Sequence, residues 1–257
     1  MFSGNFFLNF DITLIALYLF WAFFLGLVIY LNRESKREGY PLVSDVTGRV
    51  SGDGWGWTGM PSPKTFILPH GGGTVMAPRP ETPAALPIHP TKGGGDPIEP
   101  MGDPMQLGLG PAAYAQRADH PHLCYDDHKP SIVPLRAASD FYLAEEDPDP
   151  RGMVVVDADG EMAGTVVDVW VDRAEYLARF LEVQTPMGRR VLAPAPLVRV
   201  DETAGQVKVN TLLARHFEAA PVTKSADQIT LREEDQIQAY FASGQLYAKP
   251  ERSEPCL

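Results

Sequence analysis

Cysteine is scarce in this sequence: 257 residues contain two, Cys124 and Cys256. They lie far apart, and neither has a partner at Cys-x-x-Cys spacing. This pattern excludes a zinc knuckle and the disulfide framework that small secreted domains use. Reduced thiols instead fit a cytosolic location for the part of the chain that carries them.

The motifs of several common enzyme classes are absent too. The glycine runs at 71–73 and 93–95 neither end in Gly-Lys-Ser/Thr nor open an amphipathic helix, so we interpret both as loops. No Gly-x-Ser-x-Gly and no His-Glu-x-x-His sequence occurs. The formal net charge is −11, and such a surface repels nucleic acid as a whole. Classical hydrolase chemistry and nucleic-acid binding are therefore disfavoured.

One long apolar run, residues 12–31, contains no charged side chain. At about 1.5 Å per residue, a helix of this length crosses the roughly 30 Å hydrocarbon core of a bilayer. Basic residues, Arg33, Lys36 and Arg37, follow the run, whereas no side-chain charge precedes Asp11. We predict a single transmembrane helix, residues 12–32, with a periplasmic N-terminus, residues 1–11, and the bulk of the chain cytoplasmic.

Proline and glycine dominate the next part of the chain. Residues 41–134 hold 16 of the 24 prolines and 14 of the 23 glycines, a level typical of low-complexity segments. Apolar clusters interrupt the stretch, so it is no ordinary linker. We expect an extended segment, residues 33–134, that lies along the surface of another protein. The clusters are Trp55 with Trp57, residues 66–68, and Met101 with Met105, Leu107 and Leu109.

From Leu135 onward, short β-rich runs alternate with turn signals, which is typical of a small barrel or sandwich. In residues 165–171, valines alternate with a face that carries Asp168 and Trp170, so we expect a half-buried strand there. Turns are predicted at 159–160, 187–188 and 203–205 because each contains glycine. The predicted strands are residues 153–156, 165–171, 180–184, 190–193 and 207–210.

A helix is predicted over residues 231–243. Thr230 and Glu233 form a Thr-x-x-Glu capping box, and Gly244 can take the left-handed position after the last turn. The C-terminal domain then spans residues 135–250, with a tail at 251–257. The predicted fold is a single N-terminal transmembrane α-helix, an extended Pro/Gly-rich segment and a small C-terminal β-barrel with short helices.

A dense cluster of ionisable side chains precedes the β-rich region. Imidazoles and carboxylates bind borderline divalent ions, but no regular element fixes their geometry here. We predict no metal site, and keep His120, His122 and His128 as weak surface candidates. A solvated polar loop and a proton-collecting patch both remain open interpretations. The cluster consists of His120, His122, Asp126, Asp127 and His128.

Asp172, Glu175 and Arg179 form a second constellation at the end of the valine-rich strand. Asp172 is spaced from Glu175 as a helix N-cap is from N3, and Glu175 lies four residues before Arg179. A short capped helix with one ion pair would explain all three residues. An acid–base task would require a partner's active site next to this turn.

Six segments, in the order in which they occur, resemble one known family. They read REGYPL at 37–42, KTFILPHG at 64–71, GDPM at 102–105, GPAAY at 110–114, DVWVD at 168–172 and LREED at 231–235. Together they resemble the H subunit of the purple-bacterial photosynthetic reaction centre. The resemblance implies a PRC-type β-barrel on the cytoplasmic face of the photosynthetic intracytoplasmic membrane.

The resemblance also implies partners and cofactors. The H subunit holds no cofactor itself; it caps the L and M subunits, which hold bacteriochlorophyll, bacteriopheophytin, quinones and a non-haem iron. Membrane lipids are further partners, and a bound cytochrome subunit and a light-harvesting antenna are left open. By the same resemblance, the proton-relay residues are Asp172, Glu175 and Arg179 near the secondary quinone, His128 at the surface entry, and Asp126 and Asp127 beside it.

We therefore predict a non-catalytic subunit that stabilises the L/M core, shields the quinone sites and helps to conduct protons to the secondary quinone. An alternative is a membrane-tethered PRC-barrel adaptor unrelated to photosynthesis, which the acidic charge and the long anchored segment disfavour. A His/Asp metal hydrolase is a third possibility, disfavoured because its ligands would lie on an irregular loop.

Overall fold

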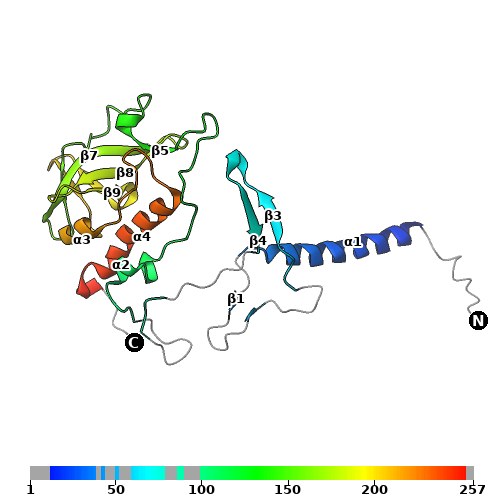
Figure 1. Ribbon diagram of the computed structural model, residues 1–257. Coiled ribbons are helices and arrows are strands. Elements are labelled where there is room, and N and C mark those ends of the chain that lie inside the picture. The colour runs from blue at the N-terminus through cyan, green and yellow to red at the C-terminus, as the bar shows by residue number, and fades with distance from the viewer. Residues whose placement is uncertain are drawn as a thin grey trace, which may run out of the picture. The chain divides into compact units, whose positions relative to one another are not determined.

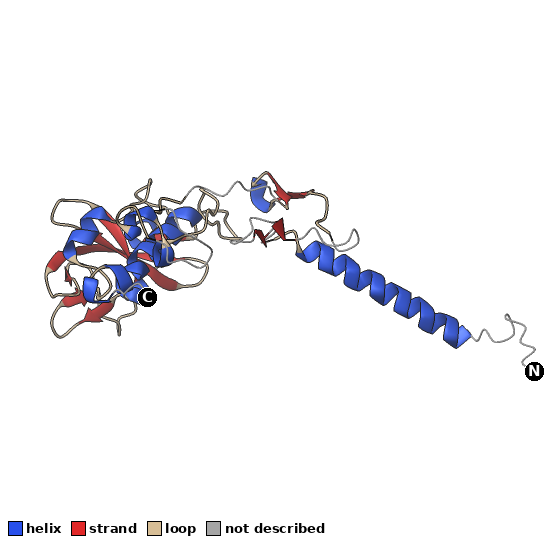
Figure 2. Cartoon of the chain, turned by 90° about the horizontal axis from the view of Figure 1, so that it is seen from below, coloured by secondary structure: helices blue, strands red, loops and turns tan. Residues whose placement is uncertain are grey.

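The computed structural model describes residues 12–38, 42–43, 50–51, 59–78, 86–89 and 99–252, which fall into two compact units (Figures 1 and 2). The first unit holds the N-terminal helix and two small hairpins, and the second holds the C-terminal sheet. Several predictions lie outside the described residues. These are the segment 1–11, the cluster of Trp55 and Trp57, the glycine run 93–95 and the tail beyond residue 252.

The first unit begins with α1 (Ile12–Ser35), the predicted apolar helix. It is long and apolar enough to cross a membrane, and none of its residues is buried within the protein. An apolar helix that is exposed on all sides needs a non-aqueous environment, and the length fits a bilayer. The prediction of this helix is confirmed, with an end at Ser35 instead of residue 32.

Two antiparallel hairpins follow in the first unit. β1 (Leu42–Val43) pairs with β2 (Val50–Ser51), and β3 (Lys64–Ile67) pairs with β4 (Thr74–Ala77). The glycine run 71–73 forms the turn of the second hairpin, where Gly71 and Gly73 take positive φ. This run is therefore a loop, as predicted. The β3–β4 hairpin itself was not predicted, because its four-residue strands are hidden among prolines and glycines.

The second unit is built on a seven-stranded sheet with the strand order β10-β11-β6-β7-β8-β9, in which β5 also pairs with β7. Figure 1 labels β5, β7, β8 and β9 of this sheet. Buried valines of β6 to β9, together with Phe180, form the centre of its hydrophobic core. The strands are β5 (Ile132–Pro134), β6 (Val154–Val156), β7 (Met162–Asp172), β8 (Leu177–Gln184), β9 (Arg190–Pro194), β10 (Arg199–Asp201) and β11 (Gln206–Lys208).

The five predicted strands correspond to β6, β7, β8, β9 and β11, whereas β5 and β10 were missed. The prediction that residues 165–171 are half-buried is wrong for the second half of β7, because both faces are buried from Asp168 to Asp172. Register shifts at Asp168 and Val171 interrupt the simple alternation, and β5 covers the end of the strand. Buried polar residues on β7 therefore need partners within the protein.

Helices pack against this sheet (Figure 2). α4 (Leu231–Tyr247) begins with the predicted capping box: the Thr230 amide donates to Glu233 Oε2 at 2.9 Å, and the Glu233 amide donates to Thr230 Oγ1 at 3.2 Å. The predicted end at Gly244 is wrong, because the helix continues to Tyr247. A Cβ at Gly244 would lie 2.3 Å from the Thr211 carbonyl oxygen, so glycine here permits close packing. The other helices are α2 (Pro104–Leu107) and α3 (Ala214–Ala219).

Part of the Pro/Gly-rich segment packs against this sheet unit. Met105, Leu109 and Ala112 are buried, and α2 contacts α4. The amides of Leu231 and Arg232 donate to carbonyl oxygens of residues 120 and 118. Residues 99–134 therefore lie at least in part along the chain's own C-terminal unit. Contact of the Pro/Gly-rich segment with a partner's surface stays a prediction.

Candidate functional site

The turn between β7 and β8 organises the candidate site. Asp172 ends β7, and its Oδ1 accepts hydrogen bonds from the amides of Ala174, at 2.9 Å, and Glu175, at 3.3 Å. Tyr176 closes the turn with a φ of 58°. The predicted short helix is wrong, because the chain enters β8 at Leu177. The predicted cap is nevertheless present in part, since the Asp172 carboxylate accepts a hydrogen bond from the Glu175 amide.

Arg179 lies on β8 and bridges this turn to α4. Its Nη2 lies 2.7 Å from Glu234 Oε1, and its Nε lies 3.9 Å from Asp172 Oδ2. Both carboxylates are more than nine-tenths buried, with relative exposures of 6% for Asp172 and 7% for Glu234. The predicted ion pair between Glu175 and Arg179 is absent from the part of the chain that the structure describes. Glu175 lies in the turn and Arg179 on β8, so the two side chains do not have the helical spacing on which the prediction depended.

These side chains surround a cavity of about 180 Å³, which we call the Asp172 cavity. Two of the side chains are arginines and three are carboxylates. Arg117, one of the arginines, also pairs with Asp235 at 3.1 Å. Such a cavity can hold a few water molecules between ionised groups, because each water needs two or more polar neighbours. The charged and imidazole-bearing residues that line it are Arg117, His122, Asp172, Glu175, Arg179 and Glu234.

Asp126, Asp127 and His128 lie on the turn that follows the buried Cys124. The Cys124 amide donates to the Lys129 carbonyl oxygen at 2.8 Å, which closes this turn. Arg173 links it to the Asp172 turn: its Nη2 lies 2.6 Å from Asp127 Oδ2, and its amide donates to the Ser131 carbonyl oxygen at 2.7 Å. The hydrogen bond from Arg173 lowers the pKa of Asp127.

The three histidines considered as weak metal candidates have different surroundings. His122 lines the Asp172 cavity, with Nδ1 3.2 Å from Ser131 Oγ, while Nδ1 of His120 lies 3.0 Å from the Pro121 carbonyl oxygen. His128 lies on the Asp126 turn at a φ of 54°. Within the described residues, no group of three or more His, Cys, Asp or Glu side chains has the arrangement of a metal site.

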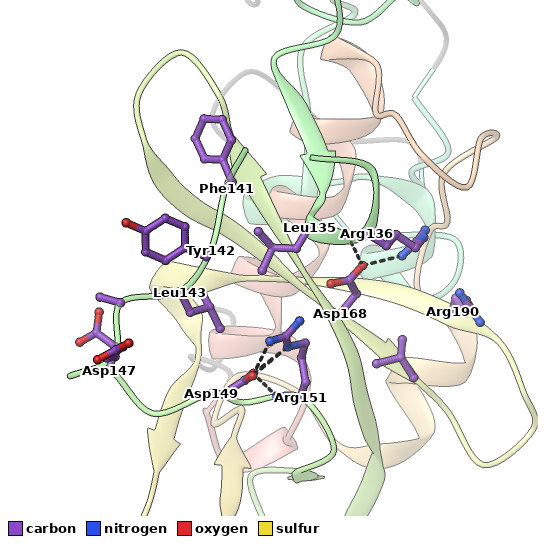
Figure 3. A pocket seen from close by; sticks show the side chains of 13 residues that line it. Leu135, Arg136, Phe141, Tyr142, Leu143, Asp147, Asp149, Arg151, Asp168 and Arg190 are labelled. Atoms are coloured by element: carbon purple, nitrogen blue, oxygen red, sulfur yellow. Dashed lines mark hydrogen bonds and ion pairs between the residues drawn. The ribbon is translucent and has the colours of Figure 1, made fainter. Parts of the chain in front are cut away.

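A larger pocket, of about 660 Å³, lies elsewhere on the second unit and contains none of the predicted relay residues (Figure 3). Arg136 and Asp168, which line this pocket, belong to an ion-pair network in which Arg136 lies 3.0 Å from Asp168 and 2.5 Å from Glu182. Burial alone would raise the pKa of Glu182, but hydrogen bonds from Arg136 and Trp170 outweigh burial and lower it. Arg190 adds a third contact at 2.9 Å. Because these charges satisfy one another, the network explains how β7 carries a buried aspartate.

The sequence did not identify all of the residues in the Asp172 cavity. Glu234 was visible only as part of the LREED segment, and its pairing with Arg179 spans 55 residues. Arg117 and Arg173 gave no signal, since single arginines on irregular segments are usually solvated. The cavity joins β7, β8, α4 and the irregular segment before β5, so only the tertiary fold assembles it.

Within the described residues, one exposed apolar helix, consistent with a single-pass membrane anchor, precedes a C-terminal β-sheet unit, and this combination defines the class of protein. Residues 144–214 match the family model of the PRC-barrel domain. Residues 4–137, more than half of the chain, match the model of the photosynthetic reaction centre H-chain N-terminal region. The chain belongs to the photosynthetic reaction centre H-chain family. Members of this family are generally non-catalytic structural subunits. Membership of the family also implies that this chain has partners in the reaction centre complex.

Proposed function

We propose that this chain caps the L and M subunits on the cytoplasmic side, shields the quinone sites and conducts protons toward the secondary quinone through the Asp172 cavity. The observation that carries the proposal is that Asp172, Glu175 and Glu234 line one small polar cavity, in which Arg179 contacts Asp172 and Glu234. Asp172 and Glu234, which both lie beside the Arg179 guanidinium, and Glu175 on the same cavity are suited to proton transfer, because neighbouring carboxylates share protons as one coupled group.

Electrostatics explain why such a cluster is useful beside a quinone. Reduction of a quinone in a low-dielectric pocket builds negative charge, which protonation relieves. On this chain, Glu175 lies on the turn at the rim of the cavity, whereas Asp172 and Glu234 lie inside. Glu175 is therefore the residue that we assign to proton exchange with a carboxylate of the partner subunits. Arg179 offsets part of the electrostatic repulsion between Asp172 and Glu234.

Protons enter, in this proposal, at Asp126, Asp127 and His128. Imidazole exchanges protons near neutral pH, and neighbouring carboxylates attract protons to the surface. Arg173 supports this assignment, since it holds Asp127 and also lies next to Asp172 in the sequence. His122, which contacts both the cavity and Ser131, offers a second exchangeable group between the entry turn and the Asp172 cavity.

The capping role is tested by purification. Detergent-solubilised native membranes should yield this chain together with near-infrared pigment absorbance, because the pigments of the complex are held by its partner subunits. Purification of the chain as a colourless monomer under mild detergent would contradict the capping role and favour the membrane-tethered adaptor.

The proton role is tested by Glu175→Gln, which keeps the size of the side chain but removes its titration. Flash-induced absorbance changes should show unchanged electron transfer to the primary quinone and a markedly slower second electron transfer to the secondary quinone. Glu202→Gln is the matched control, because Glu202 is exposed in the turn before β11, away from the cavity. Equal kinetics in the two variants would reduce Glu175 to a structural turn residue.

A further inference from the structure

The β3–β4 hairpin of the first unit exposes apolar side chains on both faces. Phe66 lies opposite Val75 in the strand register, and these side chains are 46% and 40% exposed. Ile67 and Met76 lie on the other face and are 85% and 52% exposed. A two-stranded hairpin is marginally stable in water, and it needs a surface to cover at least one face.

A charged clamp, formed by Glu34 at the end of α1, Arg37 just after it and Lys64 on β3, fixes the base of this hairpin to the end of the helix. Arg37 Nη1 donates to the carbonyl oxygens of Ser62, at 2.6 Å, and Ala77, at 2.9 Å. Glu34 accepts hydrogen bonds from Arg37 Nε, at 2.8 Å, and from Lys64 Nζ, at 2.7 Å. The hairpin therefore starts beside the end of the membrane helix.

The position of the clamp sets the depth of the hairpin. Residues 12–31 fill the hydrocarbon core, so Tyr30 and Glu34 lie at the level where the core meets the headgroups. Lys64 Nζ lies 5.8 Å from the centroid of the Tyr30 ring. Figure 1 shows the hairpin standing across the end of α1 and not continuing its axis. A strand pair with this arrangement lies along the membrane plane.

The strand register selects the face that points toward the bilayer. Lys64 reaches the helix from the same face of β3 that carries Phe66, with Val75 opposite on β4. This face is therefore turned toward the span. Residues 33–38 and 59–78, which hold the clamp and the hairpin, also carry more basic than acidic side chains, since Glu34 and Glu38 oppose four cations there. An excess of cations attracts anionic headgroups. The cations are Arg33, Lys36, Arg37 and Lys64.

We propose that the β3–β4 hairpin is a second membrane contact, which lies on an anionic lipid surface with Phe66 and Val75 in the boundary between headgroups and acyl chains. The apolar side chains gain a non-aqueous environment there, and the basic side chains remain among the phosphates. Ile67 and Met76 face away from the lipid. The hairpin then fixes the rotation of α1 about its axis, because the clamp couples the two elements.

Spin labels on the two faces test this placement in the assembled complex. Cysteine is introduced at Phe66 or at Ile67 in a chain with Cys124→Ser and Cys256→Ser, and the complex is placed in vesicles of phosphatidylcholine and phosphatidylglycerol. The label at position 66 should collide more with oxygen than with a water-soluble nickel chelate, and the label at position 67 should show the reverse. If the Phe66→Cys variant does not assemble, Val75→Cys takes its place, because Val75 lies on the same face as Phe66. The label at position 75 should then give the result expected for position 66.

Two results would overturn the proposal. Equal access of the chelate to positions 66 and 67 would place the hairpin in water, and exclusion of both oxygen and chelate from position 66 would show that protein covers that face. The clamp has its own control: Arg37→Ala should admit the chelate to position 66, whereas Arg33→Ala removes the same charge without breaking the bonds to Ser62 and Ala77. The same response in both variants would contradict the role of the clamp.

Discussion

Replacement of Arg179 by methionine tests whether one guanidinium holds the Asp172 cavity together. Methionine keeps the length and the apolar stem of the side chain but removes the charge. Asp172 and Glu234 would then remain buried without the cation that lies 3.9 Å from one and 2.7 Å from the other. The variant therefore measures how much free energy of unfolding is lost when these buried carboxylates have no neighbouring arginine.

The expected loss can be worked out from burial. Breaking a fully buried ion pair costs about 3–5 kcal/mol, because it leaves a buried charge unpaired. The Arg179 side chain is 33% exposed, and Asp172 keeps two backbone hydrogen bonds, so the loss should be smaller. We expect Arg179→Met to lower the free energy of unfolding by about 2–3 kcal/mol, close to the value of a hydrogen bond to a charged group.

Arg190→Met is the matched control, since Arg190 also pairs with a buried glutamate. Its side chain is 57% exposed, and Glu182 keeps Arg136 and Trp170 as partners. We expect a loss below about 1 kcal/mol for this variant, as for exposed pairs in general. Urea unfolding of the full chain in detergent, followed by circular dichroism, measures both losses. Equal losses in the two variants would refute the argument from burial.

Four further outcomes follow from the structure. Gly244→Ala should destabilise the full chain by about 1–3 kcal/mol despite the better helix propensity of alanine, because the alanine Cβ would clash with the Thr211 carbonyl oxygen. Unchanged urea unfolding would contradict the close packing. Burial raises the pKa of Tyr240 to about 12, so its contribution to the free energy of unfolding is present below pH about 10 and is lost as the pH rises toward 12. Tyr240→Phe should remove this loss from unfolding curves measured at alkaline pH. Burial lowers the pKa of His216, so its contribution is present above pH about 6.5 and is lost as the pH falls further; His216→Gln should flatten that slope, and an unchanged slope would exclude His216 as its source. Protease added to sealed inside-out vesicles should cut the C-terminal unit, and survival of that unit would reverse the predicted topology.

The parts of the fold that local sequence patterns determine were predicted well. α1 follows from an uninterrupted apolar run, and the start of α4 follows from the reciprocal hydrogen bonds of Thr230 and Glu233. Turns at Gly160, Gly188 and Gly205 match positive φ values. Each of these features depends on neighbouring residues only, and a short stretch of sequence therefore contains the necessary information.

Features that depend on tertiary packing were missed or predicted incorrectly. Gly244 was interpreted as a helix end because glycine favours the left-handed conformation, but its role is to admit the backbone of Thr211. Asp172 was interpreted as a helix cap, and it does bind the Glu175 amide, yet the chain turns directly into β8. In both cases the local interpretation names the right kind of residue and misses the element with which it packs.

The candidate site combines residues of both kinds. Asp172, Glu175 and Arg179 are close in sequence and stood out by their spacing, whereas their relay role came from the family resemblance. Glu234 joins them through a contact with Arg179 that no periodicity predicts. The neighbouring Asp126 turn is linked to this group by Arg173, again across many residues. An ion pair between segments that are distant in the chain cannot be predicted from the pattern of a single sequence.

Proton uptake is the measurement that tests the central claim most directly. A pH-indicator dye in weakly buffered solution reports protons taken up by the purified complex after two successive flashes. With Glu175→Gln, uptake after the second flash should slow together with the second electron transfer, while Glu202→Gln leaves both at the rates of the unmodified complex. Proton uptake at the same rate in Glu175→Gln as in Glu202→Gln would contradict proton conduction through the Asp172 cavity.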